Sequence, residues 1–360
     1  MGGRPLLRSA RLAFLKTVGA LGLDDAALRT RWRRNRLLIL GYHGIALDDE
    51  HEWDPEFYMP ASVLRRRFEL IREAGCNVLA LDDAVQQLYE GDLPPGSVVL
   101  TFDDGTYDFY ARAFPIVHAF GFPVTVYFTT YYAELERPVY DAMASYLLWK
   151  GRGRVLRWPE VLGQYGDVAL TDDGRGLAGE RLRRFPLEQE LSGRDKDALL
   201  MQLAARLEVD YEEILRRRIL QLMTLAEARE LARRGVDLQL HTHRHRVSLE
   251  EAAFDREVRD NRERLRKIRA SEPTHFCYPG GVIRREFLPW LRRRHIQSAT
   301  TCDPGMASRH HDPLLLPRYI DTTTHTESEF HAWLTGVAAL LRRRRHAEAV
   351  GQFLDARVAS

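Results

Sequence analysis

Short apolar runs alternate with amphipathic helical segments along most of the chain. The runs 37–40 and 98–102 are almost entirely apolar, which is typical of strands buried on both faces. Between them, Leu64, Phe68 and Ile71 lie at the i, i+4, i+7 spacing of a helix. Further strands are expected at about 77–81, 123–129, 236–240, 274–278, 298–301 and 314–319. Strands that alternate with helices predict an α/β fold with a parallel sheet.

This rhythm is interrupted between about residues 131 and 222. That stretch is rich in glycine up to Gly176 and then contains helical segments. We interpret it as an α-rich insertion folded over the main domain. The predicted organisation is a basic N-terminal segment (1–36), a main domain (37–325) and a C-terminal helix and tail (326–360).

Composition narrows the class of protein. The 360 residues are 45% hydrophobic and carry 53 Lys and Arg against 51 Asp and Glu, a net charge of +2. A dedicated nucleic-acid binder would carry a large positive excess, so no nucleic-acid partner is expected. Three widely spaced cysteines and the lack of a long apolar run favour a cytoplasmic protein. The basic runs 29–36 and 342–345 leave peripheral association with a membrane open.

Polar side chains follow four different apolar strands. Tyr42-His43, Asp103-Asp104, His241 to His245, and Tyr278 to Gly281 each come directly after an expected strand. The carboxyl ends of parallel strands meet at one edge of a sheet or barrel. We therefore expect these four clusters to form one site.

Three of these side chains have the chemistry of a metal site. Asp104, His241 and His245 offer one carboxylate and two imidazoles, which suit Zn²⁺, with Fe²⁺ or Co²⁺ as alternatives. His241 and His245 can face one point if the chain turns after the strand, and His243 would then point elsewhere.

The neighbouring groups suggest further roles. Asp103 can act as general base on metal-bound water if Asp104 binds the metal. The alternative is that an aspartate only caps the following helix. The backbone N–H groups of Gly280 and Gly281 could face a developing oxyanion, or the glycines could form an ordinary turn.

At these residues the sequence resembles the polysaccharide deacetylase family, the NodB-homology carbohydrate esterases. Thr101-Phe-Asp-Asp-Gly105 is similar to the first family motif, TFDDG, and His241-Thr-His-Arg-His245 to the second, H-[S/T]-x-x-H. Phe276-Cys-Tyr-Pro-Gly-Gly281 resembles a variant of the third, R-x-P-[FY]-G. The likeness spans about residues 37–320.

The resemblance implies a distorted (β/α) barrel and metal-dependent hydrolysis of an N-acetyl group from an amino sugar in a polysaccharide or glycan precursor. It would make Asp103 the catalytic base, make Asp104, His241 and His245 the metal ligands, and place the amide of Gly280 at the oxyanion. The partner implied is an acetylated carbohydrate.

The sequence departs from the family pattern in two places. Cys277 stands where the third motif has an arginine that orients the catalytic aspartate. Arg318, at the last expected strand, is the candidate replacement, with a surface or interface role as the alternative. No motif identifies the general-acid histidine, so His43, His310, His311 and His325 all stay candidates.

Other functions use the same residues. An O-acetyl esterase or a deformylase would need the same chemistry at the carbonyl carbon, and a non-haem iron oxygenase would also use two histidines and one carboxylate. A barrel that binds a glycan or partner protein without catalysis is the non-enzymatic alternative.

Overall fold

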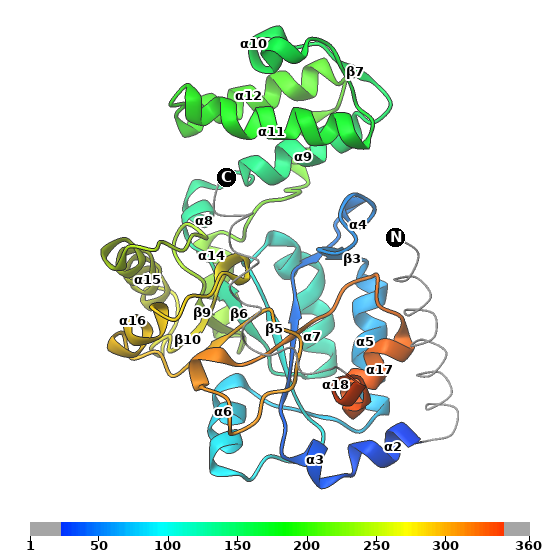
Figure 1. Cartoon of the computed structure of the whole chain (residues 1–360), viewed down its shortest axis with the longest axis vertical. Helices are drawn as coiled ribbons and strands as arrows, with labels where there is room; N and C mark the ends of the chain where they lie inside the picture. The colour runs from blue at the N-terminus through cyan, green and yellow to red at the C-terminus, as the bar shows by residue number, and fades with distance from the viewer. Residues whose placement is uncertain (1–22, 342–360) are drawn as a thin grey trace.

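A parallel sheet forms the centre of the molecule (Figure 1). The computed structural model describes residues 23–341. Across the sheet the strands follow the order β11-β10-β9-β6-β5-β1-β12, with β4 paired to β5, and every pair is parallel. The strands are β1 (Leu38–Tyr42), β4 (Asn77–Val78), β5 (Ser97–Phe102), β6 (Thr125–Phe128), β9 (Asp237–Leu240), β10 (His275–Cys277), β11 (Ser298–Thr300) and β12 (Tyr319–Ile320). The predicted α/β fold with a parallel sheet is confirmed.

The sheet curls until one short segment contacts both of its edges. Leu316 forms a parallel bridge with Thr300 of β11. Three residues further on, β12 pairs with Leu40 and Gly41 of β1. The strand expected at 314–319 is therefore partly wrong, because a 3₁₀ turn occupies Pro313–Leu315 and the strand is only Tyr319–Ile320. Prolines 313 and 317 cannot donate to a strand ladder, which limits pairing here.

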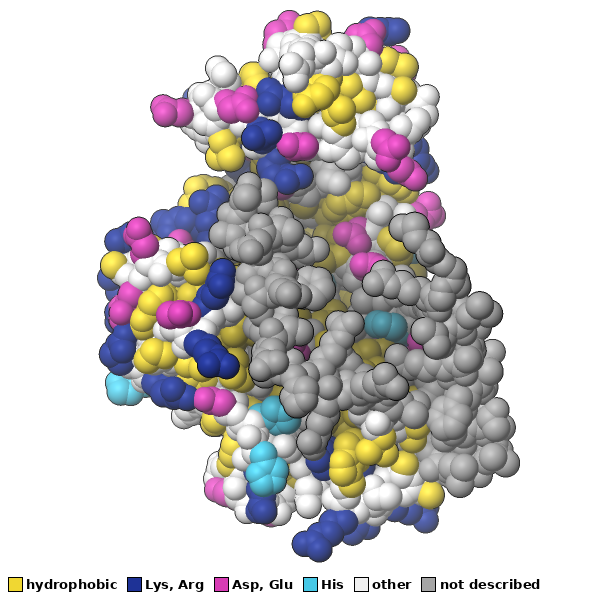
Figure 2. All heavy atoms as spheres, in the orientation of Figure 1, with side chains coloured by type: hydrophobic (Ala, Val, Ile, Leu, Met, Phe, Trp, Pro, Cys, Tyr) yellow, Lys and Arg dark blue, Asp and Glu magenta, His cyan; other side chains and the backbone are white. Residues whose placement is uncertain are grey.

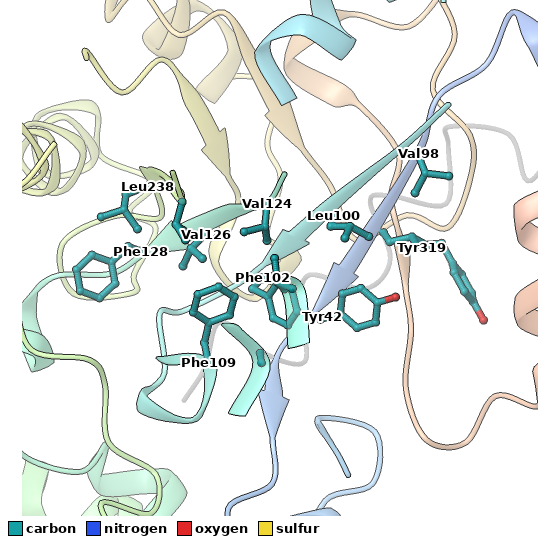
Figure 3. Packing of buried hydrophobic residues seen from close by; sticks show 14 of the residues in the cluster. Tyr42, Val98, Leu100, Phe102, Phe109, Val124, Val126, Phe128, Leu238 and Tyr319 are labelled. Atoms are coloured by element: carbon teal, nitrogen blue, oxygen red, sulfur yellow. The ribbon is translucent and has the colours of Figure 1, made fainter. Parts of the chain in front are cut away.

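Alternate residues of the strands face opposite sides of the curled sheet. Leu38, Leu40, Val98 and Leu100 pack outward in the large cluster shared with the helices (Figure 3). The residues between them form a separate inner cluster closed by α6 (Leu81–Glu90). It contains Leu37, Ile39, Val99, Tyr127, Cys277 and Leu316. Thr101, Asp103 and His241 continue these inward-facing rows at the carboxyl ends of their strands.

Helices cover the outer face of the sheet and surround it in Figure 1. They are α5 (Ala61–Glu73), α7 (Phe114–Phe120), α14 (Leu225–Arg233), α15 (Glu251–Arg266), α16 (Phe287–Arg293) and α17 (Glu327–Thr335). Thr224 and Glu227 form the reciprocal capping box of α14, which fixes where that helix begins. A shorter helix, α18 (Val337–Leu341), follows α17 after Gly336.

Residues 140–220 build most of a second apolar cluster beyond the carboxyl ends of the strands, which Tyr58 of β3 (Tyr58–Met59) joins. Residues 131–220 form α8 (Tyr131–Leu135), α9 (Tyr140–Lys150), α10 (Pro159–Leu162), α11 (Asp172–Glu188), α12 (Gly193–Arg206), α13 (Tyr211–Arg216) and the hairpin β7–β8 (Val155–Leu156, Val168–Ala169). Charged side chains of both signs are spread over the surface of this part (Figure 2). The predicted division into a main domain and an insertion at 131–222 stays our proposal.

Two sequence features extend beyond the residues that the structure describes. Most of the basic N-terminal segment and the run 342–345 fall there. Within residues 23–341, no helix is both long and apolar enough to span a bilayer.

Candidate active site

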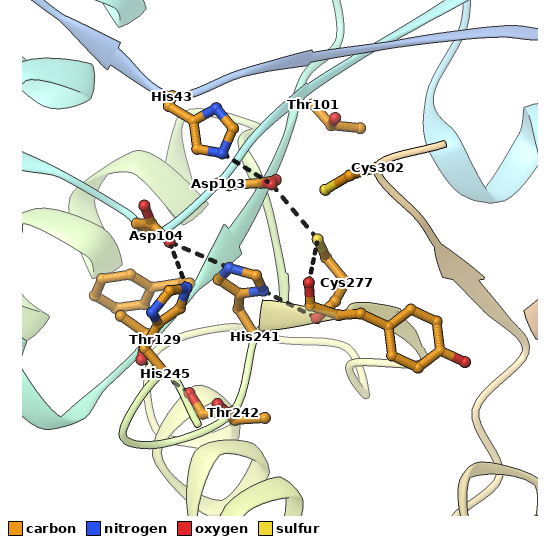
Figure 4. A network of polar contacts seen from close by, with 12 residues as sticks. His43, Thr101, Asp103, Asp104, Thr129, His241, Thr242, His245, Cys277 and Cys302 are labelled. Carbon is orange, nitrogen blue, oxygen red and sulfur yellow. Dashed lines mark hydrogen bonds and ion pairs between the residues drawn. The ribbon is translucent and has the colours of Figure 1, made fainter. Parts of the chain in front are cut away.

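Three of the four polar clusters meet at the carboxyl ends of β1, β5 and β9, and Cys277 at the end of β10 lies beside them (Figure 4). His43 follows β1, Asp103 and Asp104 follow β5, His241 begins the loop after β9, and Cys277 ends β10. The curled parallel sheet turns these ends toward one another. The geometry agrees with the expected single site for the first three clusters, whereas Tyr278 donates to Leu314 O and Gly280 is exposed.

Asp103 is buried against a guanidinium group. Its two carboxylate oxygens accept hydrogen bonds of 2.7 Å from Nη1 and Nη2 of Arg318. Arg318 also donates to the hydroxyl of Thr101 (3.2 Å) and to the carbonyl of Thr301 (3.0 Å), and Cys277 Sγ lies 3.2 Å from its Nη2. Arg318, the candidate replacement for the arginine that the third motif lacks, thus binds both oxygens of Asp103.

The charge of Arg318 decides the protonation of this carboxyl. Burial raises the pKa of Asp103, but the charge and hydrogen bonds of Arg318 outweigh it and hold the pKa at about 2. Gly41 allows β12, which follows Arg318, to approach β1 closely, since a Cβ there would lie only 2.4 Å from Ile320 Cδ1. Asp103 is therefore a carboxylate, fixed in orientation, at neutral pH.

The backbone turns sharply after Asp103. Asp104 has a φ of +68°, and its carbonyl accepts a hydrogen bond from Thr129 N. Gly105 follows with a φ of +78°, and a Cβ at this position would lie 2.0 Å from the Phe128 ring. A left-handed aspartate is a costly conformation that concentrates at functional sites. Here it rotates the Asp104 side chain away from the direction of Asp103.

Asp104, His241 and His245 converge on one point. Asp104 Oδ1 lies 3.1 Å from His241 Nε2 and 3.2 Å from His245 Nε2. One ligand atom from each residue falls within 4.8 Å of the others. The His245 side chain is 40% exposed, whereas that of His241 is buried, so this group opens toward solvent on one side.

The hydrogen bonds of His241 match those of a metal ligand. Its Nδ1 lies 2.9 Å from the carbonyl oxygen of Cys277, which can only accept, so Nδ1 must donate. In a neutral imidazole this leaves the Nε2 lone pair facing Asp104 Oδ1, an acceptor opposite an acceptor. A proton or a metal cation resolves that conflict, and a carbonyl partner on the other nitrogen is the usual support of a histidine ligand. The donor set therefore fits a divalent metal of the zinc type.

A second set of potential ligands does not fit a cation. Asp103, His241 and Cys277 also bring ligand atoms within 4.8 Å of one another. The Arg318 guanidinium already binds both Asp103 and the Cys277 sulfur, so a metal would face a fixed positive charge. Burial also raises the pKa of the Cys277 thiol well above its usual value, which keeps it protonated.

Asn261 fixes the start of the loop that carries His241 and His245, and it is missing from the residues that the sequence singled out. This buried side chain of α15 accepts from His241 N (3.0 Å) and donates to Phe128 O (2.9 Å). It lies on the same helical face as Phe254, Val258 and Leu265. A polar residue on an otherwise apolar helix face is the sequence feature that could have identified Asn261.

The remaining predicted residues fall in different places. His243 is directed away from Asp104, as expected, and its Nδ1 contacts the hydroxyl of Thr130 at 2.9 Å. Gly280 lies exposed in the turn after β10 with a φ of +60°, and among the described residues no hydrogen bond joins it to the other predicted site residues.

The four histidines that are candidates for the general acid lie in different surroundings. His43 Nε2 lies 3.6 Å from Asp103 Oδ2, and its ring packs on Phe57. His311 contacts Ser308, His325 lies beside Asp321, and His310 is exposed. Of these four, His43 alone approaches the predicted base.

Comparison with known proteins agrees with the motifs. A family model described as polysaccharide deacetylase matches residues 90–146 and 214–298. The poly-beta-1,6-N-acetyl-D-glucosamine N-deacetylases of Escherichia coli strain K12 and of O157:H7 are each 34% identical over 94 residues, which is 26% of this chain. The matched part spans 14% of the length of these relatives.

Solved structures extend the likeness to most of the chain. The deacetylase PplD of Streptococcus pyogenes aligns with a TM-score of 0.52 at 17% identity, covering 80% of this chain and 93% of that one. A de-N-acetylase from Aggregatibacter actinomycetemcomitans also reaches 0.52, at 14% identity, and covers 83% of this chain and 99% of that one. At this identity the likeness concerns the fold, and it confirms the predicted NodB-type curled sheet.

The class that fold and motifs define is thus an α/β protein with a deacetylase-type sheet. Residues 90–146 and 214–298 match the model of the polysaccharide deacetylase family, in agreement with the motifs.

Proposed function

We propose that this protein removes N-acetyl groups from an amino sugar in a polysaccharide or glycan precursor by metal-dependent hydrolysis. The observation that carries the proposal is the pairing of two acidic groups with different partners. Asp103 is held by Arg318, while the adjacent Asp104 faces His241 and His245. The activity for which the Escherichia coli relatives are named supports poly-β-1,6-linked N-acetylglucosamine as the first substrate to test.

In this proposal Asp104, His241 and His245 hold the metal. The metal, most simply zinc, would polarise the acetamide carbonyl and lower the pKa of water. The other groups then act on protons and on orientation. We assign the backbone N–H of Gly280 to the side of the developing oxyanion, as the third motif implies.

Asp103 is the proposed base. Its carboxylate takes a proton as the water oxygen attacks the carbonyl carbon, and Arg318 keeps it in orientation. His43 Nε2, 3.6 Å from Asp103 Oδ2, can receive that proton and deliver it to the sugar nitrogen as the C–N bond breaks. The products are acetate and the free amino sugar, so water supplies every atom that is added.

The test is acetate release from a β-1,6-linked N-acetylglucosamine oligomer, with metal content measured on the same samples by elemental analysis. Asp103→Asn should lower turnover by about 10²- to 10⁴-fold and retain the metal. The His241→Ala variant should lose both the metal and turnover. Loss of the metal in Asp103→Asn would contradict the division of roles between the two aspartates.

Matched variants test the acid. His43→Ala should lower turnover by about 10²-fold or more, whereas His310→Ala, which changes an exposed histidine, should keep wild-type turnover. Protein that neither contains nor takes up metal, and releases no acetate, would overturn the proposal in favour of a barrel that only binds. Acetate or formate released only from O-acetyl or N-formyl sugars would overturn the substrate assignment.

A further inference from the structure

A groove with arginines toward both ends lies in the insertion, between α9 and α11. It encloses about 150 Å³ and is lined by Asp141, Ala144, Ser145, Arg175, Gly176, Gly179 and Arg183. Its small residues keep the space open, since a Cβ added to Gly176 would meet no atom within 4 Å. Arg175 and Arg183 are eight residues apart on α11, or about 12 Å along the helix.

Three cations gather at the Asp141 end without a direct partner. Arg183, Lys196 of α12 and Arg246 make no side-chain hydrogen bond or ion pair with any residue from 23 to 341. Arg183 lines the groove with Asp141, and the charges of Arg183, Lys196 and Arg246 all act to lower the pKa of Asp141, against the effect of burial, which raises it. One acidic group does not neutralise three basic ones.

The other end of the groove provides a contrast. Arg175 forms an ion pair with Asp172 and is already neutralised. The excess positive charge is therefore confined to the end near Asp141.

This end is connected to the candidate active site through the chain. Arg246 directly follows His245, whose imidazole faces Asp104. Its backbone N–H binds the hydroxyl of Thr242 within the same loop. In the space-filling view, basic side chains gather where the insertion meets the rest of the molecule (Figure 2). A glycan lying across His245 would pass this positive surface.

We propose that the groove binds a phosphate or carboxylate group carried by the acetylated glycan. This inference rests on the proposed function and names the substrate class, an anionic glycan. Guanidinium groups bind phosphate and carboxylate oxygens through paired N–H groups, so such a ligand would satisfy the cations that Asp141 leaves without a partner. A neutral glycan would leave them unpaired.

Binding is measured by calorimetry in the Asp103→Asn background, so that turnover does not interfere. The probes are an N-acetylglucosamine tetramer, the same tetramer with one phosphate monoester, and a tetramer with one glucuronate unit. At low salt at least one charged tetramer should bind about tenfold more tightly than the neutral one, and salt should reduce the difference.

Two independent changes to the groove should remove this preference. Arg183→Gln with Lys196→Gln removes two cations, and Gly176→Leu fills the space while replacing glycine by a better helix former. Each should reduce the difference to less than about threefold. Arg184→Gln is the matched control, because Arg184 is exposed on the same helix and pairs with Glu180. It should keep the full preference.

Equal binding of all three tetramers to the unchanged groove, or an unchanged preference in both groove variants, would overturn the inference. The result is separable from the proposed function. Charge-selective binding without acetate release by the wild type would support the groove and contradict the deacetylase. Acetate release by the wild type with equal binding of all three tetramers would support the deacetylase and contradict the groove.

Discussion

The candidate site has two halves, one around Asp103 and one around Asp104, and they balance the negative charge of their aspartate in different ways. Asp103 is buried, and the protein supplies its counter-charge through Arg318. Asp104 instead shares one oxygen with two histidines, one of them open to solvent. The first half is complete as a hydrogen-bonded unit, whereas the second has acceptors facing one another. The protein itself thus supplies the counter-charge of Asp103, and in the proposed function a metal supplies that of Asp104.

The largest expected effect comes from removing the internal counter-charge. Arg318→Met leaves Asp103 buried and unpaired, which should cost about 3–5 kcal/mol of unfolding free energy in urea denaturation. Arg67→Met is the matched control, because Arg67 forms another buried ion pair, with Asp321. It should cost a similar amount and keep turnover in the protein that remains folded.

A second arginine variant covers the case in which Arg318→Met does not fold. Arg318→Lys keeps the charge and loses the paired hydrogen bonds, so it should fold with reduced turnover. Wild-type stability and turnover in both variants would show that Asp103 does not depend on this partner.

Asp108 shows what burial does to a carboxyl without a cation. It accepts hydrogen bonds from Ile45 N and the Thr106 hydroxyl, but burial outweighs them and raises its pKa to about 7. Because the folded pKa exceeds the unfolded value of about 3.9, stability is full below pH 4 and is lost as pH rises toward 7, by about 4 kcal/mol. Asp108→Asn should remove this part of the pH dependence in denaturation curves from pH 4.5 to 8. Identical slopes in variant and wild type would contradict it.

Stabilisation by added zinc should depend on the half that contains Asp104, His241 and His245, and not on Asp103. Zinc at 100 times its dissociation constant should raise the unfolding free energy of the wild type by about 2.7 kcal/mol. Asp103→Asn should keep this gain and His245→Ala should lose most of it, as measured by thermal unfolding with and without zinc. An equal gain in His245→Ala would place the metal elsewhere.

The smallest effect is expected at Cys277. Its sulfur contacts both Asp103 and Arg318, yet the thiol is neutral and the Arg318–Asp103 hydrogen bonds do not need it. Cys277→Ser should therefore change the unfolding free energy by about 1 kcal/mol or less and keep turnover within about threefold. Abolished turnover in Cys277→Ser would show that the thiol takes part in the reaction. Arg318 and Asp103 would then no longer form a complete unit by themselves.

Local signals predicted the strands and the residues that follow them. Asp103, Asp104, His241 and His245 are recognisable because they lie directly after apolar runs and within two short motifs. Their convergence followed from parallel strand topology alone. Their catalytic and metal-binding roles stay predictions until the variants are measured.

Contacts between distant segments were harder to predict. The choice of His43 over His310, His311 and His325 depends on which strand ends lie beside β5. The role of Asn261 depends on the packing of α15 against two strand ends. Arg318 could be named as a candidate, but its contact with Asp103 depends on how far the sheet curls.

The segment 316–320 also has a consequence for the order of folding. It bridges β11 and β1 and delivers Arg318 to a carboxylate 215 positions earlier in the chain. Contacts of such long sequence separation are slow to form, because the intervening loop must close first. During synthesis Asp103 has no contact with the Arg318 guanidinium until residue 318 has left the ribosome. The proposed base therefore gains its arginine partner late, after most of the sheet that carries it has been synthesised.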